Sequence, residues 1–509
     1  MIENILILGN GFDLAMERKT SYEDFLRFLN SLSFLLYCQK AYNQQIDVKN
    51  YDFLLKEFDD ILGDSESDSE EDFQNELEFY NSSSDTVKSD KVKLGILLDC
   101  LSNYFNDKKI RLIPFFEKNR NFKAYSESEG GNFRRDLLSN LKSIREEKGD
   151  IESKYFLDVD VIDDLIQMAG TKNYEWLLKI RSNLFFDFIN EFKDKLGEKW
   201  SSIELIISDI AEAIAYVKKH LEENSQIIEW RSTDDLTKLK KKFITKSNYI
   251  AFKVVIACLS GYRFIYTDSG WQQIVDVCNE ECIQALEELT DYLEFYLTYL
   301  DKLDFDSEQR IVKQDSSLDA IEGLENAKVL TFNYTDTTNR LFGIPEENTH
   351  FIHGRIDFTR KQKLINTMVF GIEDKEEKTE NINPDLISYQ KFYQRIIKET
   401  GSDYRKFFAT IEDSDNLRLK PIDDMNIIVF GHSVDPLDKE IFINCFDLAQ
   451  KRGGKYKFIF NYYDEKAKRE IVKNLTIILG KERMISLTAE QKVAFVKCDD
   501  VQRMERELL

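Results

Sequence analysis

Five short apolar runs in the C-terminal part of the chain restrict its fold more than any other feature. Each run is too short for a helix and ends directly before a small or polar residue. The runs occupy residues 329–332, 351–352, 368–370, 426–430 and 457–460, and they are followed by Asn333, His353, Gly371, Gly431 and Asn461. Such runs, separated by polar and helical segments, are typical of parallel strands that are buried on both faces of a sheet. The pattern therefore predicts an α/β fold with a mainly parallel sheet and helices on both faces.

The N-terminus begins with a run of the same kind. Residues 5–8 are apolar, and the segment Gly-Asn-Gly-Phe-Asp follows at once at residues 9–13. A strand followed by a glycine turn is the first half of a dinucleotide-binding fingerprint, because glycine lets a backbone bend sharply and approach a phosphate closely. Leu14 stands where the third glycine of that fingerprint would be. A plain strand-to-helix turn is therefore the alternative for this segment.

The region between the N-terminal run and the later runs differs from both. Residues 59–90 are rich in acidic residues and serine, which predicts an exposed, disordered loop. Apolar residues recur at three- and four-residue steps along 203–221 and 274–300, and proline is absent between Pro114 and Pro345. Both features predict helices. We expect the first part of the α/β domain at 1–58, the acidic loop at 59–90, an inserted helical domain at 91–324, and the second part of the α/β domain at 325–509.

Charge and cysteine usage exclude several classes of protein. The net charge of −23 disfavours nucleic acid as the main ligand, since binding a phosphate backbone requires a basic surface. The seven cysteines are scattered, and they have no partners at metal-ligand spacing, so we expect a reduced, cytoplasmic protein without a metal site. The N-terminal run is too short for a signal peptide, and uninterrupted apolar stretches stay below the roughly 18 residues of a membrane span.

Taken in order, the residues that close the runs resemble the motifs of sirtuin-like NAD-binding domains. Residues 9–11 stand where that family has a Gly-Ala-Gly turn, and Thr331-Phe-Asn333 followed by an acid resembles its Thr-Gln-Asn-x-Asp motif. Asp336 lies one residue further on than the acid of that motif. Later matches to His-Gly, Phe-Gly, Gly-x-Ser and Ile-Asn pairs occur at 353–354, 370–371, 431–433 and 460–461. The resemblance implies a Rossmann-like sheet with NAD as ligand. From the periodicity, we expect the large all-α insertion to interrupt this sheet. The paired cysteines that hold zinc in protein deacylases are missing.

A narrower resemblance covers the N-terminal 40 residues and roughly 325–465. It is carried by Leu-Gly-Asn-Gly-Phe-Asp-Leu-Ala at 8–15, Thr-Ser-Tyr-x-Asp-Phe at 20–25, Thr-Phe-Asn-Tyr-Thr at 331–335, Ile-His-Gly at 352–354 and Phe-Gly-His-Ser-Val-Asp at 430–435. These segments resemble the bacteriophage abortive-infection AbiH family. Membership would imply a bacterial anti-phage defence protein.

The chemistry expected at such a site is cleavage of the bond between nicotinamide and ribose. This reaction passes through an oxocarbenium-like state, and an oriented water with a nearby base assists it. We predict that Asn333 orients the water or a ribose hydroxyl and that His353 accepts the proton, since imidazole ordinarily titrates near neutral pH. For either residue alone, the alternative is a structural role, as a strand cap for Asn333 and as a hydrogen-bonded buried imidazole for His353.

The predicted binding residues lie at the glycine turns and strand ends. Backbone N–H groups and short polar side chains there would meet the pyrophosphate and ribose groups of a nucleotide. These residues are Gly9, Asn10, Gly11, Phe12, Asp13, Thr331, Asp336, Gly431, His432, Ser433, Asp435 and Asn461.

Two classes of function stay open on the sequence alone. One is an NAD glycohydrolase that releases nicotinamide and ADP-ribose and depletes the infected cell of NAD. The other is a sensor, in which the same pocket binds NAD or a derivative without turnover. For both we expect a homo-oligomer and a phage-derived or operon-encoded activator. A nuclease is disfavoured by the acidic composition and by the lack of clustered acids with metal-site spacing.

Overall fold

The computed structural model describes residues 2–26, 28, 183, 185, 200–223, 255, 271–306, 310–357, 365–372, 383–409 and 423–509. The chain divides into two compact units. The first unit comprises Met1–Ser21, Leu297–Lys375 and Lys391–Leu509, and the second comprises Tyr22–Tyr296 and Glu376–Gln390. The first unit thus resumes at Leu297, before the boundary expected at 325. The predicted acidic loop and much of the predicted helical insertion lie outside the described residues.

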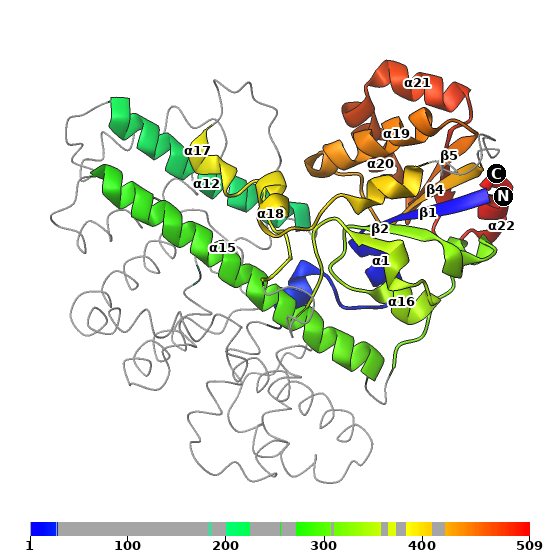
Figure 1. Cartoon of the computed structure of the whole chain (residues 1–509), viewed down its shortest axis with the longest axis horizontal. Coiled ribbons are helices and arrows are strands. Elements are labelled where there is room, and N and C mark those ends of the chain that lie inside the picture. Colours follow the sequence, from blue (N-terminus) through cyan, green and yellow to red (C-terminus); the bar gives the residue numbers. More distant parts are fainter. Residues whose placement is uncertain are drawn as a thin grey trace, which may run out of the picture. The chain divides into compact units, whose positions relative to one another are not determined.

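The first unit contains a six-stranded sheet in which all neighbouring strands are parallel (Figure 1). The strands are β1 (Ile2–Leu8), β2 (Lys328–Thr331), β3 (Thr349–Phe351), β4 (Asp424–Phe430), β5 (Tyr456–Tyr462) and β6 (Val493–Lys497). Their order is β3-β2-β1-β4-β5-β6, so the chain adds β2 and β3 on one side of β1 and the later strands on the other. Open parallel sheets bind ligands outside the carboxyl ends of the strands at such a reversal. The predicted α/β fold is confirmed.

Helices cover the sheet and connect its strands. In the first unit they are α1 (Asn10–Ala15), α16 (Thr337–Phe342), α18 (Lys391–Ile397), α19 (Lys439–Arg452), α20 (Glu465–Leu479), α21 (Lys481–Ala489) and α22 (Val501–Glu507). Short turns of other helix types are the π-helix η1 (Lys302–Asp306) and the 3-10 helices η2 (Ser317–Ala320), η3 (Leu324–Asn326), η4 (Glu346–Asn348), η6 (Asp403–Phe408) and η7 (Pro436–Asp438).

Both faces of the sheet are buried, which explains why its strands are nearly continuous apolar runs. Alternate residues of a strand point to opposite faces. On β1, Ile5 and Ile7 belong to a core with residues of α19, α20 and α21, whereas Leu6 and Leu8 belong to a second core with residues of α1 and α22. The strands therefore form the middle layer between two sets of helices.

Residues 368–370 were predicted as a strand, and this prediction is wrong. This segment lies outside the six-stranded sheet. Side chains of residue 394 in α18 and residue 398 just after it bind part of its backbone, and the Val369 N–H donates to the His353 carbonyl oxygen at 2.7 Å. The amide of Gln394 donates to the Phe370 carbonyl oxygen at 3.0 Å and accepts from the Phe370 N–H at 2.9 Å. Lys398 Nζ donates to the Met368 carbonyl oxygen at 2.7 Å. Side chains thus supply most of the hydrogen bonds that the backbone of a neighbouring strand would otherwise make. Strand β6, in contrast, was not predicted.

The described part of the second unit is helical, as the periodicity predicted. Its helices are α12 (Trp200–Glu223), α17 (Pro384–Ile387) and α15 (Trp271–Asp301), whose last turn belongs to the first unit. Lys218 of α12 connects the three helices by ion pairs. Its Nζ lies 2.8 Å from an oxygen of Asp276 in α15 and 2.7 Å from an oxygen of Asp385 in α17. Cys278 and Cys282 of α15 are buried, and their thiols are free. Among the described helices, none is long and apolar enough to cross a bilayer.

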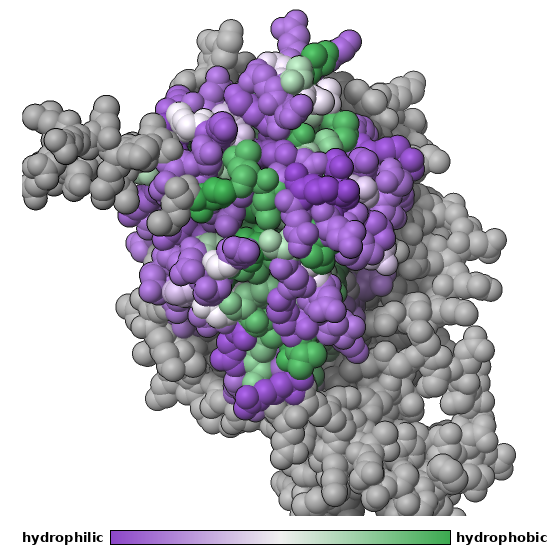
Figure 2. Space-filling model, turned by 90° about the vertical axis from the view of Figure 1, so that its right-hand side faces the viewer, coloured by the Kyte–Doolittle hydropathy of each residue, from purple (hydrophilic) through white to green (hydrophobic). Residues whose placement is uncertain are grey.

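The surface is largely hydrophilic on the face that Figure 2 shows, as the excess of acidic residues suggests. A stripe of apolar residues interrupts it (Figure 2). Among the described residues of α20 and α21, Ile477 and Ile485 are the most exposed of the large apolar side chains. These helices cover the sheet and contribute no side chain to the polar cluster described below.

Candidate functional site

The turns that follow β1 and β4 pack directly against each other at the reversal of strand order. Gly9 N–H donates to the Phe430 carbonyl oxygen at 3.1 Å, and Gly11 N–H donates to the Gly431 carbonyl oxygen at 2.8 Å. A Cβ atom on Gly431 would lie 2.0 Å from the Phe12 nitrogen. The turns thus need glycine where their backbones touch. Because Gly9 and Gly11 give their N–H groups to the β4 turn, these two donors are not available to a phosphate in this structure.

Asn333 is fixed between the ends of β1 and β2. Its side-chain Nδ2 donates to the Gly9 carbonyl oxygen at 3.1 Å, and its backbone N–H donates to Thr331 Oγ1 at 3.0 Å. The residue is buried. Thr331 therefore serves as a local acceptor at the end of β2, and the Asn333 amide is oriented by the first glycine turn.

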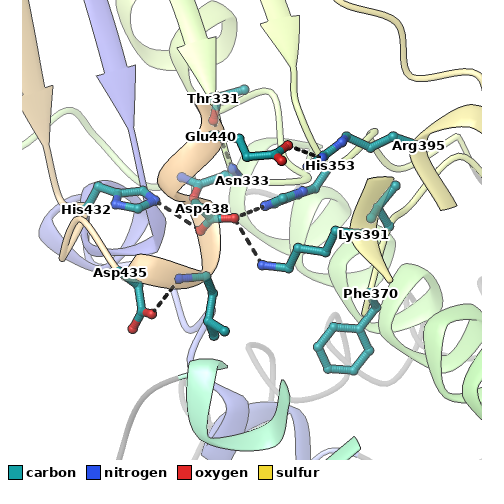
Figure 3. Close-up of polar contacts among 12 residues, drawn as sticks. Thr331, Asn333, His353, Phe370, Lys391, Arg395, His432, Asp435, Asp438 and Glu440 are labelled. Atoms are coloured by element: carbon teal, nitrogen blue, oxygen red, sulfur yellow. Dashed lines mark hydrogen bonds and ion pairs between the residues drawn. The ribbon is translucent and has the colours of Figure 1, made fainter. Parts of the chain in front are cut away.

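A single carboxylate joins two of the histidines predicted for the site (Figure 3). Asp438 Oδ1 lies 3.3 Å from His353 Nε2, and Asp438 Oδ2 lies 3.6 Å from His432 Nε2. Lys391 Nζ donates to the same Oδ1 at 3.0 Å. At most 10% of any of these four side chains is exposed. Phe332 lines the cluster, with its ring centroid 5.4 Å from that of His353 and 4.3 Å from that of His432.

The loop after β4 presents Asp438 through one turn of 3-10 helix. Asp435 Oδ1 accepts from the Leu437 N–H at 3.1 Å and so caps η7, whose first residue is Pro436. Proline is favoured at this position because it needs no N–H partner. Asp435, one of the predicted nucleotide-binding residues, thus has a structural role in this structure. Asp438, at the other end of the turn, contacts the imidazoles.

His432 has a defined tautomer. Its Nδ1 accepts from the Val434 N–H at 2.8 Å, so the proton of the neutral imidazole must lie on Nε2, which faces Asp438. Val434 has a φ of 54°, which is rare for a β-branched residue. Such backbone conformations cost about 1–3 kcal/mol and cluster at functional sites. The hydrogen bond from the Val434 N–H to His432 helps to stabilise this conformation of Val434.

The charges of the cluster favour an ionised Asp438 and a neutral His353. Burial would raise the pKa of Asp438, but the Lys391 ammonium and the two imidazoles outweigh it and hold the pKa well below its ordinary value. Burial lowers the pKa of His353 to about 4; Lys391 adds to this effect and Asp438 opposes it. His353 Nδ1 is buried and has no hydrogen-bond partner among the described residues. With Nε2 facing Asp438, Nδ1 carries the lone pair and is the basic atom.

We expect the His353 imidazole to stay neutral from pH 8 to about pH 5 and to gain a proton only near pH 4, because burial and Lys391 disfavour the imidazolium. The measurement is a pH titration of histidine ring signals by NMR, in protein with labelled histidine. Because the chain has only four histidines, a His353→Gln variant identifies the signal. A midpoint near the ordinary value of 6.5 would contradict the arrangement of charges described above.

Three other predicted binding residues make side-chain contacts inside the protein. Asn461 Oδ1 accepts from Ser317 Oγ at 2.6 Å. Asp13 Oδ2 accepts from Thr335 Oγ1 at 2.5 Å. The ring of Phe12 is buried in the core against those of Phe342 and Phe430. These contacts give each residue a structural role, and a contact with a ligand stays a prediction for all of them.

The remaining predicted residues lie at the starts of helices or in turns. Asn10 is the first residue of α1. Asp336 precedes α16; burial raises its pKa to about 6, and its Oδ1 has no hydrogen-bond partner among the described residues. The Ser433 carbonyl oxygen accepts from Asn474 Nδ2 at 3.0 Å.

A second buried ionic cluster lies beside the first turn and was not predicted. Arg18 is fully buried and donates to Asp304 Oδ2 at 2.8 Å, to Asp301 Oδ1 at 2.5 Å and to Thr337 Oγ1 at 2.6 Å. Asp13 adds a third carboxylate that raises the pKa of Arg18. The cluster holds the turn after α1 against the end of α15 and the start of α16.

Asp438 and Lys391 are also residues that the sequence reasoning missed. The sequence could have indicated Asp438, because it lies three residues after the predicted site residue Asp435 and so on the same side of a helical turn. No feature of the sequence indicated Lys391, since a lysine at the start of a helix ordinarily faces solvent. Within the described ranges, no group of three or more His, Cys, Asp or Glu residues is arranged to hold a metal ion.

The model of the family described as "Bacteriophage abortive infection AbiH" matches residues 5–463. This range includes both glycine turns and all four residues of the Asp438 cluster. Neither the curated proteins nor the solved structures gave a match.

Proposed function

Because the chain belongs to the bacteriophage abortive infection AbiH family, we propose that this phage-defence protein acts by hydrolysing NAD to nicotinamide and ADP-ribose. The observation that carries the proposal is the buried His353–Asp438 pair. It offers a basic nitrogen, without a hydrogen-bond partner in the described part of the chain, next to the strand ends where the order of a parallel sheet reverses. The order β3-β2-β1-β4-β5-β6 is also that of Rossmann-type dinucleotide-binding sheets, which supports a nucleotide as ligand.

In the proposed reaction, water attacks the anomeric carbon of the nicotinamide-bearing ribose. The bond to nicotinamide breaks, and nicotinamide leaves as a neutral molecule with the bonding electrons. His353 Nδ1 takes one proton from the water, and the ionised Asp438 stabilises the resulting imidazolium through Nε2–H. Asn333, which Gly9 orients, is proposed to position the water or a ribose hydroxyl. The imidazolium then returns its proton to solvent.

The pyrophosphate of NAD requires donors other than Gly9 and Gly11, whose N–H groups bind the β4 turn. We propose Asn10 and Ser433 for this role, because both follow strand ends at the reversal of strand order and both have polar side chains. Asp13, Asp336 and the other predicted residues remain proposals as ribose or phosphate contacts.

His353 Nδ1 is buried in this structure, so its covering groups must move before a substrate can reach it. A toxic NAD hydrolase has to be held inactive in a healthy cell. We propose that assembly into a homo-oligomer, or binding of a phage-derived or operon-encoded partner, uncovers this atom. The same burial is the observation that favours the second candidate function, a sensor that binds NAD or a derivative without turnover.

The test is release of nicotinamide and ADP-ribose from NAD by the purified full-length protein. We expect Asn333→Ala and His353→Ala each to lower kcat by about 10²–10⁴-fold, the usual contribution of a positioned proton acceptor. The matched control is His350→Gln. His350 is a buried histidine on β3 that packs on Tyr404 at 5.5 Å between ring centroids and belongs to no part of the Asp438 cluster. Its replacement should leave kcat within a few-fold of wild type.

Two outcomes would count against the hydrolase. Release that His353→Ala does not reduce would place the chemistry elsewhere. NAD binding without release, both by the purified protein and in phage-infected cells, would favour the sensor.

A further inference from the structure

We propose that Asp438 is a positioning residue, which accepts from the Nε2–H of both imidazoles and, by holding the proton of His353 on Nε2, leaves the Nδ1 lone pair of His353 to act on the ligand. The identity of that ligand rests on the proposed function above. The positioning itself is a property of the protein, and it can be tested without any substrate.

Three donors surround the Asp438 carboxylate and use both of its oxygens. Lys391 Nζ and His353 Nε2 lie 3.0 and 3.3 Å from Oδ1, and His432 Nε2 lies 3.6 Å from Oδ2. An ammonium group can only donate, and an ionised carboxylate can only accept. The carboxylate is therefore suited to this place because both of its oxygens are acceptors.

His432 leaves only one arrangement for its own proton. Its Nδ1 is occupied by the Val434 N–H, so its Nε2 must donate. Any group at position 438 that serves His432 must therefore present an acceptor toward it. This requirement decides how a substituted side chain would be oriented.

His353 has no comparable backbone constraint, so its tautomer depends on Asp438. With an acceptor at Nε2, the proton stays on Nε2, and Nδ1 is the base. With a donor there, the proton would move to Nδ1 and the basic atom would face position 438. In hydrolases that use a comparable Asp–His pair, replacing the acid by its amide gives the wrong tautomer and costs about 10⁴-fold in kcat.

The decisive variant combines Lys391→Met with Asp438→Asn. It removes one positive and one negative charge together, so no unpaired charge is left buried. His432 must still donate, so the Asn amide oxygen should turn to His432 and the amide NH₂ to His353. We expect nitrogen NMR of histidine-labelled protein to show His353 changed to the Nδ1–H tautomer and His432 unchanged. Four His→Gln variants assign the signals, and hydrogen exchange in β4 confirms folding.

Lys391→Met alone is the matched control, because it keeps the carboxylate. At pH 8 both imidazoles should keep the proton on Nε2. The pKa of His353 should rise, since the lysine charge that lowers it is gone. If Asp438 acted in packing alone, the double variant as well would leave the proton of His353 on Nε2.

The proposal fails if His353 is the Nδ1–H tautomer in the wild type, or if it keeps the Nε2–H tautomer in the double variant. Turnover provides a separate result. If the wild type releases nicotinamide, the double variant should lower kcat by at least about 10²-fold with KM little changed. The expected tautomers without release in the wild type would support the positioning role and reject the hydrolase.

Discussion

Gly431→Ala should destabilise the first unit by more than about 4 kcal/mol, an exceptional loss for a single methyl group. Two effects combine. Gly431 has a φ of 68°, in the left-handed region, where a Cβ atom costs about 1–2 kcal/mol. The added Cβ would also lie 2.0 Å from the Phe12 nitrogen and 2.4 Å from the Gly11 carbonyl carbon. These neighbours are backbone atoms, so they can move only if the turns after β1 and β4 separate.

Gly343→Ala separates the two effects. Gly343 has almost the same φ, 67°, but its Cβ would have no atom within 4 Å. This variant should lower the free energy of unfolding only by the cost of a Cβ atom at a left-handed φ, about 1–2 kcal/mol. The measurement is hydrogen exchange of β1 and β4 peptides, which reports the first unit alone. Equal losses in the two variants would show that the turns can part at little cost, and that their contact does not organise the site.

The parallel sheet was predictable because burial on both faces of a strand makes its sequence apolar at every position. The run at 368–370 has the same signature for a different reason. It is buried, but most of its backbone partners are side chains, among them those of Gln394 and Lys398, which lie 24 and 30 residues further on from Phe370 and Met368. Local pattern cannot distinguish these partners from a strand. β6 was overlooked because it ends in the exposed Lys497 and carries no motif at its end.

The two imidazoles of the site were predictable, but the groups that control them were not. His353 stands directly after an apolar run and His432 one residue after another, so their place at the carboxyl ends of the strands follows from the strands. Asp438 reaches them only because Asp435 and Pro436 form one 3-10 turn before it. Lys391 can be buried because its ammonium group forms an ion pair with the Asp438 carboxylate. Such mutual dependence between residues 47 positions apart arises from tertiary structure and leaves no local signature.

Arg18→Met should destabilise the first unit by about 3–5 kcal/mol, the usual cost of removing one partner from a buried ion pair. The side chain of Arg18 is fully buried and binds Asp301 and Asp304. Methionine fills much of the same space but leaves these carboxylates, and Asp13 nearby, without their cation. The matched control is Arg340→Met. The guanidinium carbons of Arg18 and Arg340 lie 4.8 and 4.9 Å from the centroid of the same Phe305 ring, so both variants lose this contact.

The control variant should lower the free energy of unfolding by no more than about 1 kcal/mol, because Arg340 is 41% exposed and pairs with Asp306 at the surface.

The pH dependence of stability provides a second distinction between the two variants. Burial already raises the pKa of Asp301 and Asp304, and Arg18 opposes this rise. Without Arg18 both pKa values rise further, so the folded variant takes up protons more readily than the unfolded chain as the pH falls. The loss of stability of Arg18→Met relative to wild type should therefore become smaller as the pH falls from 8 to 5, whereas the loss of stability of Arg340→Met should stay constant. Hydrogen exchange in β1 measures both. A deficit that is independent of pH would mean that Arg18 acts through packing, and that its charge does not hold the turn after α1 in place.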